Sequence, residues 1–361
     1  MIINDIYLLN FRKYQKLHLS FAPQINILCG PNASGKTTIL EAIYMLSMAK
    51  SGRTSNDADM IKTGEELFYI KGSFKVNGYN EILSIAYDKK GKQVKRNENL
   101  YKSLSEFVGI VNVVMFTPQD FLLFDKGPSE RRNFIDIIIC QVSKNYMRDL
   151  YLYRKILKER NLLLKELIHN KNNKNLTLLE VLTTQLANHG DQIIQYRKRF
   201  INKISKLAGI KYQTLTDEKN KLELVYNTST NGGLLLKQLN DGYELDLAKG
   251  STKTGPHLDD INFILNGQNA LDFGSQGEKR TIILSIKLAL LELMHEIKKE
   301  YPILLLDDVF SELDNQRQNA LVTALKTDIQ TIITTTSLAG LNQKLLTNAK
   351  IIETEKIGVD F

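Results

Sequence analysis

The chain has 361 residues, a hydrophobic fraction of 43% and a formal net charge of +8. This length can bury a large core and suggests two or three domains. Two cysteines in apolar surroundings and five scattered histidines argue against a disulfide framework, a catalytic thiol or a zinc site. No apolar run approaches the roughly 18 residues of a membrane span, and no signal peptide is apparent. We therefore expect a cytoplasmic protein without a membrane partner.

The first fifty residues predict strands followed by a phosphate-binding loop. Ile2–Leu8 and Leu17–Phe21 alternate apolar with polar residues, and Ile25–Cys29 is a short apolar strand. The sequence GPNASGKT follows directly at Gly30–Thr37, and Thr38–Leu46 then shows helical apolar spacing. A strand, a glycine-rich loop and a helix in this order are the context that a P-loop requires.

The chemistry of a P-loop explains these residue types. Consecutive backbone N–H groups and the positive end of the following helix bind phosphate, and Gly30 and Gly35 allow the backbone to take the necessary shape. Lys36 should reach the β- and γ-phosphates of ATP, and Thr37 should bind Mg²⁺. The residues expected to contact the nucleotide in this loop are Gly30, Pro31, Asn32, Ala33, Ser34, Gly35, Lys36, Thr37 and Thr38.

The middle of the chain changes from strands to helices. Residues 67–96 predict a strand meander with a basic hairpin tip, and the pattern becomes helical from about residue 129. Apolar residues step by three and four through Tyr153–Leu167 and Leu179–Ile204, on either side of a polar tip at 170–175. We expect an antiparallel helical hairpin here, and a return to strands over Leu222–Leu247.

The excess positive charge is confined to this helical segment. Lys144–Lys206 holds 14 of the 48 Lys and Arg residues but only 5 of the 40 Asp and Glu residues, which leaves 34 basic and 35 acidic residues elsewhere. Such a segment attracts polyanions. A solvated, lysine-rich helical surface without a ligand is the alternative interpretation.

Near the C-terminus, two carboxylates follow a buried strand. Ile303–Leu306 is an unbroken apolar run, and Ile329–Thr334 is another, after an amphipathic helix predicted over Thr281–Lys299. Asp307 is placed to bind magnesium, and Asp308 could polarise the attacking water. About 270 residues separate these carboxylates from the P-loop, so both chain ends must assemble one nucleotide site.

The turn before the amphipathic helix allows two interpretations. Ser275 and Glu278 have the spacing of a capping box, which needs no function. A helix start with small residues is also an anion site, and Ser275 and Gly277 could hold the γ-phosphate bound to a second subunit. Both interpretations can be true together.

These motifs in combination resemble the nucleotide-binding head of the ABC ATPase superfamily. The split ends and the helical insertion resemble its SMC-like DNA-repair branch, and more narrowly the RecF family. The matching stretches are Leu8–Tyr14, the P-loop Gly30–Thr37 with Leu40–Tyr44, Ser51–Thr54, Thr117–Asp120, Gly255–His257, Ser275–Glu278 and Leu304–Asp314. The implied fold class is α/β, an ABC-type P-loop ATPase head with an inserted helical arm. We place the two parts of the head at 1–128 and 251–361, and the arm at 129–250.

The resemblance also implies roles for single residues. Gln119 matches the Q-loop, which senses Mg²⁺ and the γ-phosphate. The implied catalytic residues are therefore Lys36, Asp308 and Gln119, and the implied metal ligands are Thr37, Asp307 and Gln119. Ser275 and Gly277 match the signature that completes the partner's site. The remaining matches are Arg53 near the nucleotide, Asp314 in the loop that crosses the dimer interface, and Thr335 and Thr336 at the switch position.

Three residues depart from the family pattern. Ala33 replaces a common glycine, and Leu258 stands where the family usually has arginine, which puts a basic contact there in doubt. Asp308 is one methylene shorter than the glutamate of transporters, which favours slow hydrolysis.

The implied function is an ATP-dependent homodimer that clamps gapped or single-stranded DNA, with weak, DNA-stimulated ATP hydrolysis resetting it. RecO and RecR are the implied partners, with RecA loading, replication fork maintenance and the SOS response as the implied roles. The basic residues expected to contact DNA are Arg148, Arg154, Lys155, Lys158, Arg197, Lys198 and Arg199.

Two other classes of protein remain open. A transporter ATPase subunit would need a membrane partner, a shorter gap between its motifs and a switch histidine where this chain has threonines. A small-molecule P-loop kinase would work as a monomer with a substrate pocket. A membrane-fraction assay tests the first, and stimulation of turnover by DNA rather than by a metabolite excludes the second.

Overall fold

A computed structural model describes residues 1–356 except Lys102, 170–172, 217–219, 231–232, Asp314, Lys326 and Gly340. Its internal contacts divide the chain into two compact units, which we describe one at a time. The first unit contains Met1–Phe121, Ile210–Lys219 and Gln276–Phe361, and the second contains Leu122–Gly209 and Asn220–Ser275. The sequence places the arm at 129–250, whereas the contacts extend the second unit to 122 and 275 and give 210–219 to the first.

A five-stranded parallel sheet forms the centre of the first unit. Its strand order is β14-β3-β13-β12-β8, and every neighbouring pair is parallel. The strands are β3 (Ile25–Cys29), β8 (Val113–Phe116), β12 (Ile303–Asp307), β13 (Thr331–Thr335) and β14 (Ala349–Glu353). Every residue of β12 and β13 is buried, as their unbroken apolar runs predict for strands covered on both faces.

The parallel arrangement brings distant segments to one edge. The carboxyl ends of β3, β13 and β12 lie side by side, so the loops that follow these strands emerge together. The P-loop follows β3 and the two aspartates lie at the end of β12. The strand order therefore assembles the site from both chain ends.

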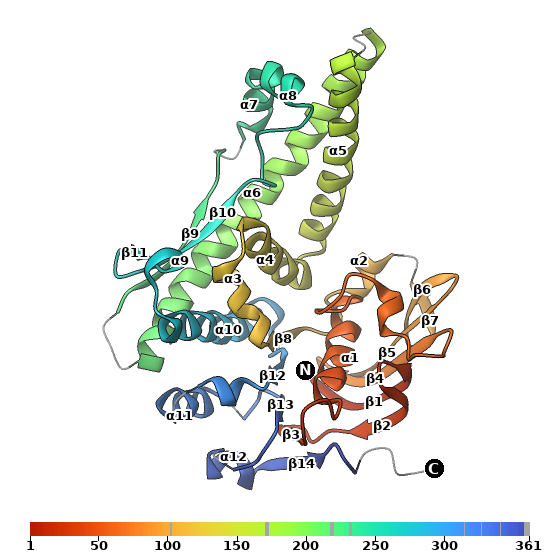
Figure 1. Ribbon diagram of the computed structural model, residues 1–361, viewed down its shortest axis with the longest axis vertical. Helices are drawn as coiled ribbons and strands as arrows, with labels where there is room; N and C mark the ends of the chain where they lie inside the picture. The colour runs from red at the N-terminus through yellow and green to blue at the C-terminus, as the bar shows by residue number, and fades with distance from the viewer. Residues whose placement is uncertain are drawn as a thin grey trace. The chain divides into compact units, whose positions relative to one another are not determined.

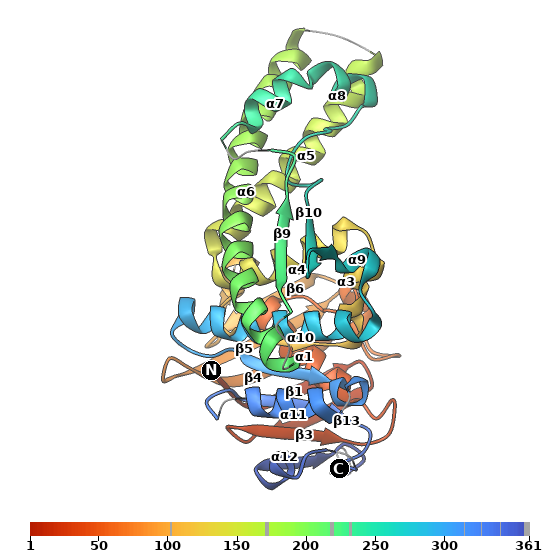
Figure 2. The ribbon, with the colours of Figure 1, turned by 90° about the vertical axis from the view of Figure 1, so that its left-hand side faces the viewer.

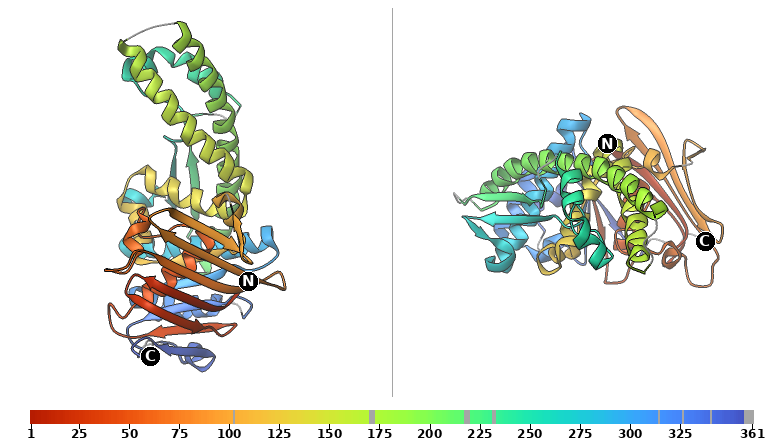
Figure 3. Two further views of the ribbon diagram at one scale, coloured as in Figure 1. Left: turned by 90° about the vertical axis from the view of Figure 1, so that its right-hand side faces the viewer. Right: turned by 90° about the horizontal axis from the view of Figure 1, so that it is seen from above.

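A six-stranded antiparallel sheet forms the second layer of this unit, and its broad face is visible in Figure 3. The strands are β1 (Ile2–Phe11), β2 (Tyr14–Ser20), β4 (Phe68–Val76), β5 (Tyr79–Asp88), β6 (Gly91–Arg96) and β7 (Asn99–Tyr101). The predicted meander over 67–96 is confirmed, and β7 extends it by one short strand.

Helix α1 (Lys36–Met48) lies between the two sheets, with contacts to β4 and β5 on one side and to β8, β12 and β13 on the other. All of its residues except Thr37 are buried, which fits a helix covered on both sides. The other helices of the unit are η1 (Asp57–Met60), α2 (Leu104–Phe107), η2 (Pro118–Phe121), α10 (Gln276–Lys298), η3 (Val309–Glu312), α11 (Asn315–Ala324) and α12 (Gln343–Thr347).

The prediction that Thr281–Lys299 is amphipathic is wrong for the middle of the helix. Every residue of α10 from Thr281 to Leu291 is buried. The charge of Lys287 is compensated inside the core, because its Nζ lies 2.8 Å from Oδ1 of Asp120 and donates to the carbonyl oxygen of Met115 at 2.5 Å.

The second unit is built on a long helical hairpin. Helices α5 (Lys144–His169) and α6 (Asn173–Thr216) confirm the two predicted helices. Of the predicted polar tip at 170–175, residues 170–172 lie outside the described residues and 173–175 belong to the start of α6. Strands β9 (Leu222–Asn227) and β10 (Asp260–Leu265) pair antiparallel alongside α6 (Figures 1 and 2). The other elements are α3 (Leu122–Asp125), α4 (Pro128–Val142), α7 (Leu235–Asp241), α8 (Tyr243–Lys249), β11 (Gln268–Asn269) and α9 (Ala270–Phe273).

Only part of Leu222–Leu247 returns to strands as predicted, because α7 and α8 occupy its second half. Across the described part of the chain, no helix combines the length and the apolar character that a membrane crossing requires.

Candidate nucleotide-binding site

A cavity of about 560 Å³ lies within the first unit, at the edge where the parallel strands end. The P-loop residues 32–38 line it together with Asp307, Asp308 and Thr334. Arg12, Lys13 and Arg53 also line it, so further cationic side chains border the cavity. A concave site with convergent backbone N–H groups, cations and two carboxylates suits a nucleotide with its metal ion.

Steric limits explain the glycine of the P-loop. Gly35 has a φ of 102°, and a Cβ at this position would meet the Tyr14 hydroxyl oxygen at 2.4 Å. Ala33, which replaces a family glycine, takes the left-handed region with a φ of 62°. That conformation costs a non-glycine residue about 1–2 kcal/mol, which is tolerable in a loop fixed by its surroundings. The Nζ atom of Lys36 donates to the carbonyl oxygens of Gly30 and Pro31 at 2.6 and 2.8 Å.

Residues that the sequence reading missed brace this loop. Thr354, just after β14, shares a hydrogen bond of 2.6 Å between its Oγ1 and Oγ of Ser34. A Cβ on Gly30 would lie 2.2 Å from the same Oγ1, so Thr354 requires glycine there. Tyr14 approaches from β2, and burial raises its pKa to about 12. No local pattern identifies Thr354, because its partner lies 320 residues away.

The P-loop and the aspartate strand meet at Asp307. Its Oδ1 accepts hydrogen bonds from Oγ1 of Thr37 at 2.9 Å and from Oγ1 of Thr334 at 2.8 Å. Burial raises the pKa of Asp307, and these two hydrogen bonds oppose the rise. Thr334 belongs to β13, the strand between β3 and β12, so it bridges the two halves of the site.

Asp308 lines the cavity and has a left-handed backbone conformation. Its φ is 52°, in the left-handed region that favours glycine, and its N–H donates to Oγ1 of Thr334 at 2.9 Å. Thr334 therefore contacts both carboxylate residues. It reaches the cavity, whereas the predicted switch residues Thr335 and Thr336 are not among its lining residues.

A buried glutamate holds the two arginines of the cavity wall. Glu41 on α1 accepts from Nε and Nη2 of Arg12 at 3.1 and 2.7 Å, and from Oγ of Ser51 at 2.5 Å. The guanidinium of Arg53 lies 3.8 Å from the same carboxylate. Arg53 thus lines the cavity, and its predicted contact with the nucleotide stays a prediction. The sequence reading gave Arg12 and Glu41 no role, although both lie in motif stretches.

The structure brings some predicted residues together and leaves others apart. Gln119, in η2, is exposed and does not line the cavity, while its neighbour Asp120 binds Lys287 of α10. Ser275 directly precedes α10 and Gly277 lies in its first turn, and neither lines the cavity. Asp314 lies outside the described residues, so its predicted place in a dimer interface stays a prediction.

One predicted DNA contact is wrong. Arg197 is 3% exposed, and its guanidinium binds the Asp136 carboxylate and the Pro256 carbonyl inside the second unit. Its charge is therefore used in the core and cannot face a phosphate. Among the others, Arg154 is exposed but also bonds Asp136, at 3.0 Å. The remaining predicted residues are exposed or half-buried on α5 and α6, namely Arg148, Lys155, Lys158, Lys198 and Arg199.

This fold and site define a class of protein. A P-loop after β3, an aspartate pair after β12 and a second chain segment that completes the parallel sheet form an ABC-type nucleotide-binding head, with an inserted helical arm between its parts. The family model for the RecF/RecN/SMC N-terminal domain matches residues 2–356. The chain belongs to the RecF family.

Individual relatives agree with this assignment. The chain is 40% identical to the DNA replication and repair protein RecF of Bacillus cereus (strain G9842) and of Bacillus thuringiensis (strain Al Hakam), with 100% of this chain and 98% of each relative aligned. A solved structure of the recombination mediator protein RecF with ATP, from the RecFOR pathway, has a TM-score of 0.87 at 35% identity, over 94% of this chain and 93% of the other. An Smc head domain shares the fold, with a TM-score of 0.57 at 17% identity, over 98% of this chain and 94% of the other.

Proposed function

We propose that this protein is an ATP-gated DNA clamp of recombinational repair. The observation that carries the proposal is the hydrogen bond of 2.9 Å between Thr37 and Asp307, which joins residues 270 positions apart into one nucleotide site. Membership of the RecF family and the ATP in a similar solved structure support ATP as the ligand. The nucleotide then acts as a switch rather than as a source of a transferred group.

Magnesium suits the oxygen atoms at this position. The Thr37 hydroxyl and the Asp307 carboxylate are hard ligands that both line the cavity, and their oxygens lie 2.9 Å apart. These two residues would hold the ion, with Gln119 as a further ligand after a change in its position. When bound, Mg²⁺ neutralises charge on the β- and γ-phosphates.

Three residues are proposed to carry out ATP hydrolysis. Lys36 binds the phosphates, Asp308 polarises the attacking water, and Gln119 senses the γ-phosphate. The short carboxylate of Asp308 fits slow turnover and a long-lived ATP state. DNA is proposed to raise this weak activity.

Two copies of the chain are proposed to close on two ATP molecules. Ser275 and Gly277 at the start of α10 would contact the γ-phosphate bound by the partner, where helix N–H groups favour an anion. Asp314 would lie at the same interface. ATP would stabilise the dimer because it touches both copies, and hydrolysis would remove that bridge.

The exposed cations of α5 and α6 are proposed to bind the DNA backbone, so binding should be independent of sequence and weakened by salt. Gapped or single-stranded DNA is the proposed substrate. RecO and RecR are the proposed partners in RecA loading, with roles in replication fork maintenance and the SOS response. The names of the relatives support this assignment to DNA replication and repair.

The dimer is tested by molecular mass in solution, with and without ATP and Mg²⁺. We expect a dimer only with both. Ser275→Arg should abolish that dimer and leave ATP binding within about twofold, because it places a large cation at the interface and leaves the P-loop intact. A protein that stays monomeric with ATP and Mg²⁺ would rule out the clamp, and a dimer that survives Ser275→Arg would leave Ser275 a simple helix cap.

The DNA ligand is tested by binding of gapped, single-stranded and duplex DNA across a salt series. We expect affinity to rise with ATP and to fall steeply with salt. Affinity that does not change with salt would contradict backbone binding.

A further inference from the structure

Arg317 of helix α11 contacts the start of α10. The Nε atom of Arg317 donates to Oγ1 of Thr281 at 2.7 Å, and Oγ1 of Thr281 donates to the carbonyl oxygen of Gly277 at 2.8 Å. Thr281 is completely buried. All three residues lie in the first unit, so this chain of bonds is internal to one compact body.

The same guanidinium lies next to Gly277, on the side where any other residue would carry its Cβ atom. A Cβ built on Gly277 would lie 3.7 Å from Nη2 of Arg317, which is an ordinary contact distance. Arg317 therefore lies against the turn at Gly277 and is also linked to it by hydrogen bonds through Thr281. Its charge also adds to the positive end of α10, where an anion would bind.

Its neighbour holds the loop that follows the aspartates. The side chain N–H of Gln318 donates to the carbonyl oxygens of Phe310 at 2.7 Å and of Leu313 at 3.1 Å. That loop begins at Asp308, whose carbonyl oxygen accepts from Oγ of Ser311 at 2.6 Å. One turn of α11 thus contacts both the segment after the general base and the turn proposed to face the partner's ATP.

We propose that Arg317 is a positioning residue for ATP-dependent dimerisation. It holds the first turn of α10 in the orientation in which Ser275 and Gly277 bind the γ-phosphate of the second copy. The inference rests on the proposed dimer. It adds that the signature turn depends on a cation from α11 and on the hydroxyl of Thr281.

The first experiment compares dimer formation among matched variants. Arg317→Ala should weaken the ATP-dependent dimer about tenfold, as expected for a lost charged hydrogen bond, and leave ATP binding by the monomer within about twofold. Thr281→Val should weaken it less, and the loss in the double variant should be smaller than the sum of the two single losses, because the two residues share one hydrogen bond. Arg317→Lys should recover part of the loss, since it keeps the charge. Lys16→Ala, an exposed cation on β2, is the control.

Several outcomes would overturn the proposal. A dimer of Arg317→Ala as tight as that of the wild type would do so, and so would additive effects of Arg317→Ala and Thr281→Val. Circular dichroism and melting temperature, compared with those of Lys16→Ala, separate this loss from misfolding.

A second measurement decides the matter if the wild type itself does not dimerise, which would defeat the proposed function. Hydrogen exchange of the amides of residues 281–285 in the ATP-free monomer reports directly on the first turns of α10. Arg317→Ala should accelerate that exchange about tenfold. Unchanged exchange would mean that Arg317 does not position the turn.

Discussion

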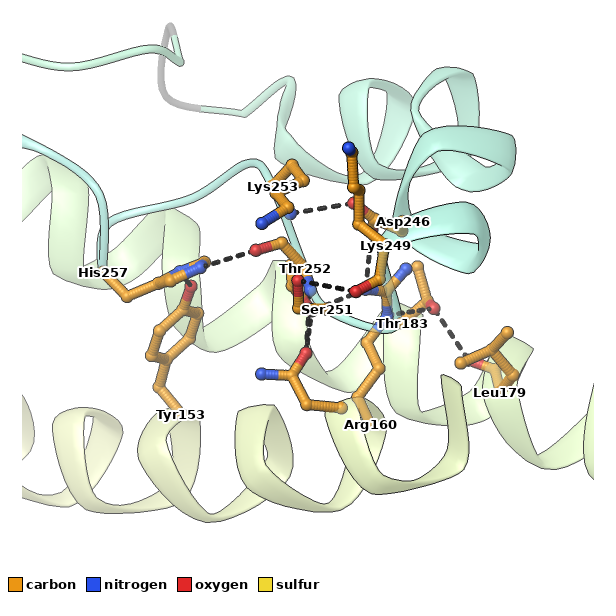
Figure 4. A network of polar contacts seen from close by, with 11 residues as sticks. Tyr153, Arg160, Leu179, Thr183, Asp246, Lys249, Ser251, Thr252, Lys253 and His257 are labelled. Carbon is orange, nitrogen blue, oxygen red and sulfur yellow. Dashed lines mark hydrogen bonds and ion pairs between the residues drawn. The ribbon is translucent and has the colours of Figure 1, made fainter. Parts of the chain in front are cut away.

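The charged side chains of the nucleotide cavity and those inside the arm are used in opposite ways. In the first unit, Lys36, Asp307 and Asp308 all line one cavity, so their charged groups can reach a ligand there. In the second unit, two buried arginines, Arg160 and Arg197, are each paired with a buried carboxylate. Arg160 and Asp246 are 1% and 2% exposed and form a pair at 2.8 Å, and the Arg160 guanidinium also bonds Thr183 and Thr252 (Figure 4).

The difference shows why a count of cations is a weak guide to function. Breaking a closed buried pair leaves a lone charge in the core, which is costly for stability. Removing a charge that faces a cavity costs ligand binding instead. The basic residues of the arm therefore fall into two groups. The exposed cations are available to a polyanion, and the buried ones stabilise the packing of the helices.

The largest effect is expected at the cavity. Lys36→Ala should lower ATP turnover about a thousandfold, because the ammonium that stabilises the transferred phosphate charge is lost. The melting temperature should change little, since the hydrogen bonds of Lys36 to described residues go to the loop carbonyls of Gly30 and Pro31. Steady-state phosphate release measures the first effect and thermal melting the second. Turnover within tenfold of the Lys16→Ala control would remove Lys36 from the mechanism.

The closed pair of the arm should show the reverse pattern. Asp246→Ala should destabilise the protein by about 3–5 kcal/mol, because it leaves the Arg160 charge buried without its carboxylate. Denaturant unfolding measures this loss, while ATP affinity of the folded variant should stay the same. Lys221→Ala removes the exposed ion pair with Glu223 in the same unit and should cost at most about 1 kcal/mol. Equal costs for the two variants would contradict the distinction between closed and exposed charges.

The exposed cations of the arm should act on DNA and not on stability. The variant with both Lys155→Ala and Lys158→Ala should weaken DNA binding and lower the salt slope of the affinity by about 2, one unit per phosphate contact. Arg197→Ala should instead lower stability and leave the salt slope unchanged, because Arg197 is buried against Asp136. Fluorescence anisotropy across a salt series measures both. A reduced slope for Arg197→Ala would return it to the DNA surface.

A smaller effect is expected from His257 in the arm. Its Nε2 must donate to the Thr252 carbonyl at 3.1 Å, so Nδ1 of the neutral ring accepts from the Tyr153 hydroxyl at 2.6 Å (Figure 4). Burial lowers the pKa of His257. Below about pH 6.5 the histidine is protonated in the unfolded chain but stays neutral in the folded chain. The contribution of His257 to the free energy of unfolding is therefore fully present above that pH and is lost as the pH decreases. Unfolding from pH 7.5 to 5.5 should show this fall, and His257→Gln should flatten it. An identical slope in both proteins would exclude His257 as its source.

Local patterns predicted most of the nucleotide site. The P-loop, its strand and its helix are contiguous, so backbone geometry and spacing within about twenty residues specify them. The apolar run of β12 and the aspartates after it are also local, and the structure places Thr37 against Asp307. The hairpin of α5 and α6 follows from three- and four-residue apolar spacing, which holds wherever one face of a helix is covered.

Other features depend on contacts between distant residues. Thr334 joins the two halves of the site only because β13 lies between β3 and β12 in the sheet, and sheet order is not encoded in the spacing of any one strand. Thr354 braces the P-loop from 320 residues away. Arg197 reads as a surface cation in a basic helix, and only the carboxylate of Asp136, 61 residues earlier, makes it a core residue. The local sequence was thus enough to predict where the nucleotide binds. The tertiary structure decided which charged side chains stay available to ligands, because folding places some of them beside a partner of opposite charge.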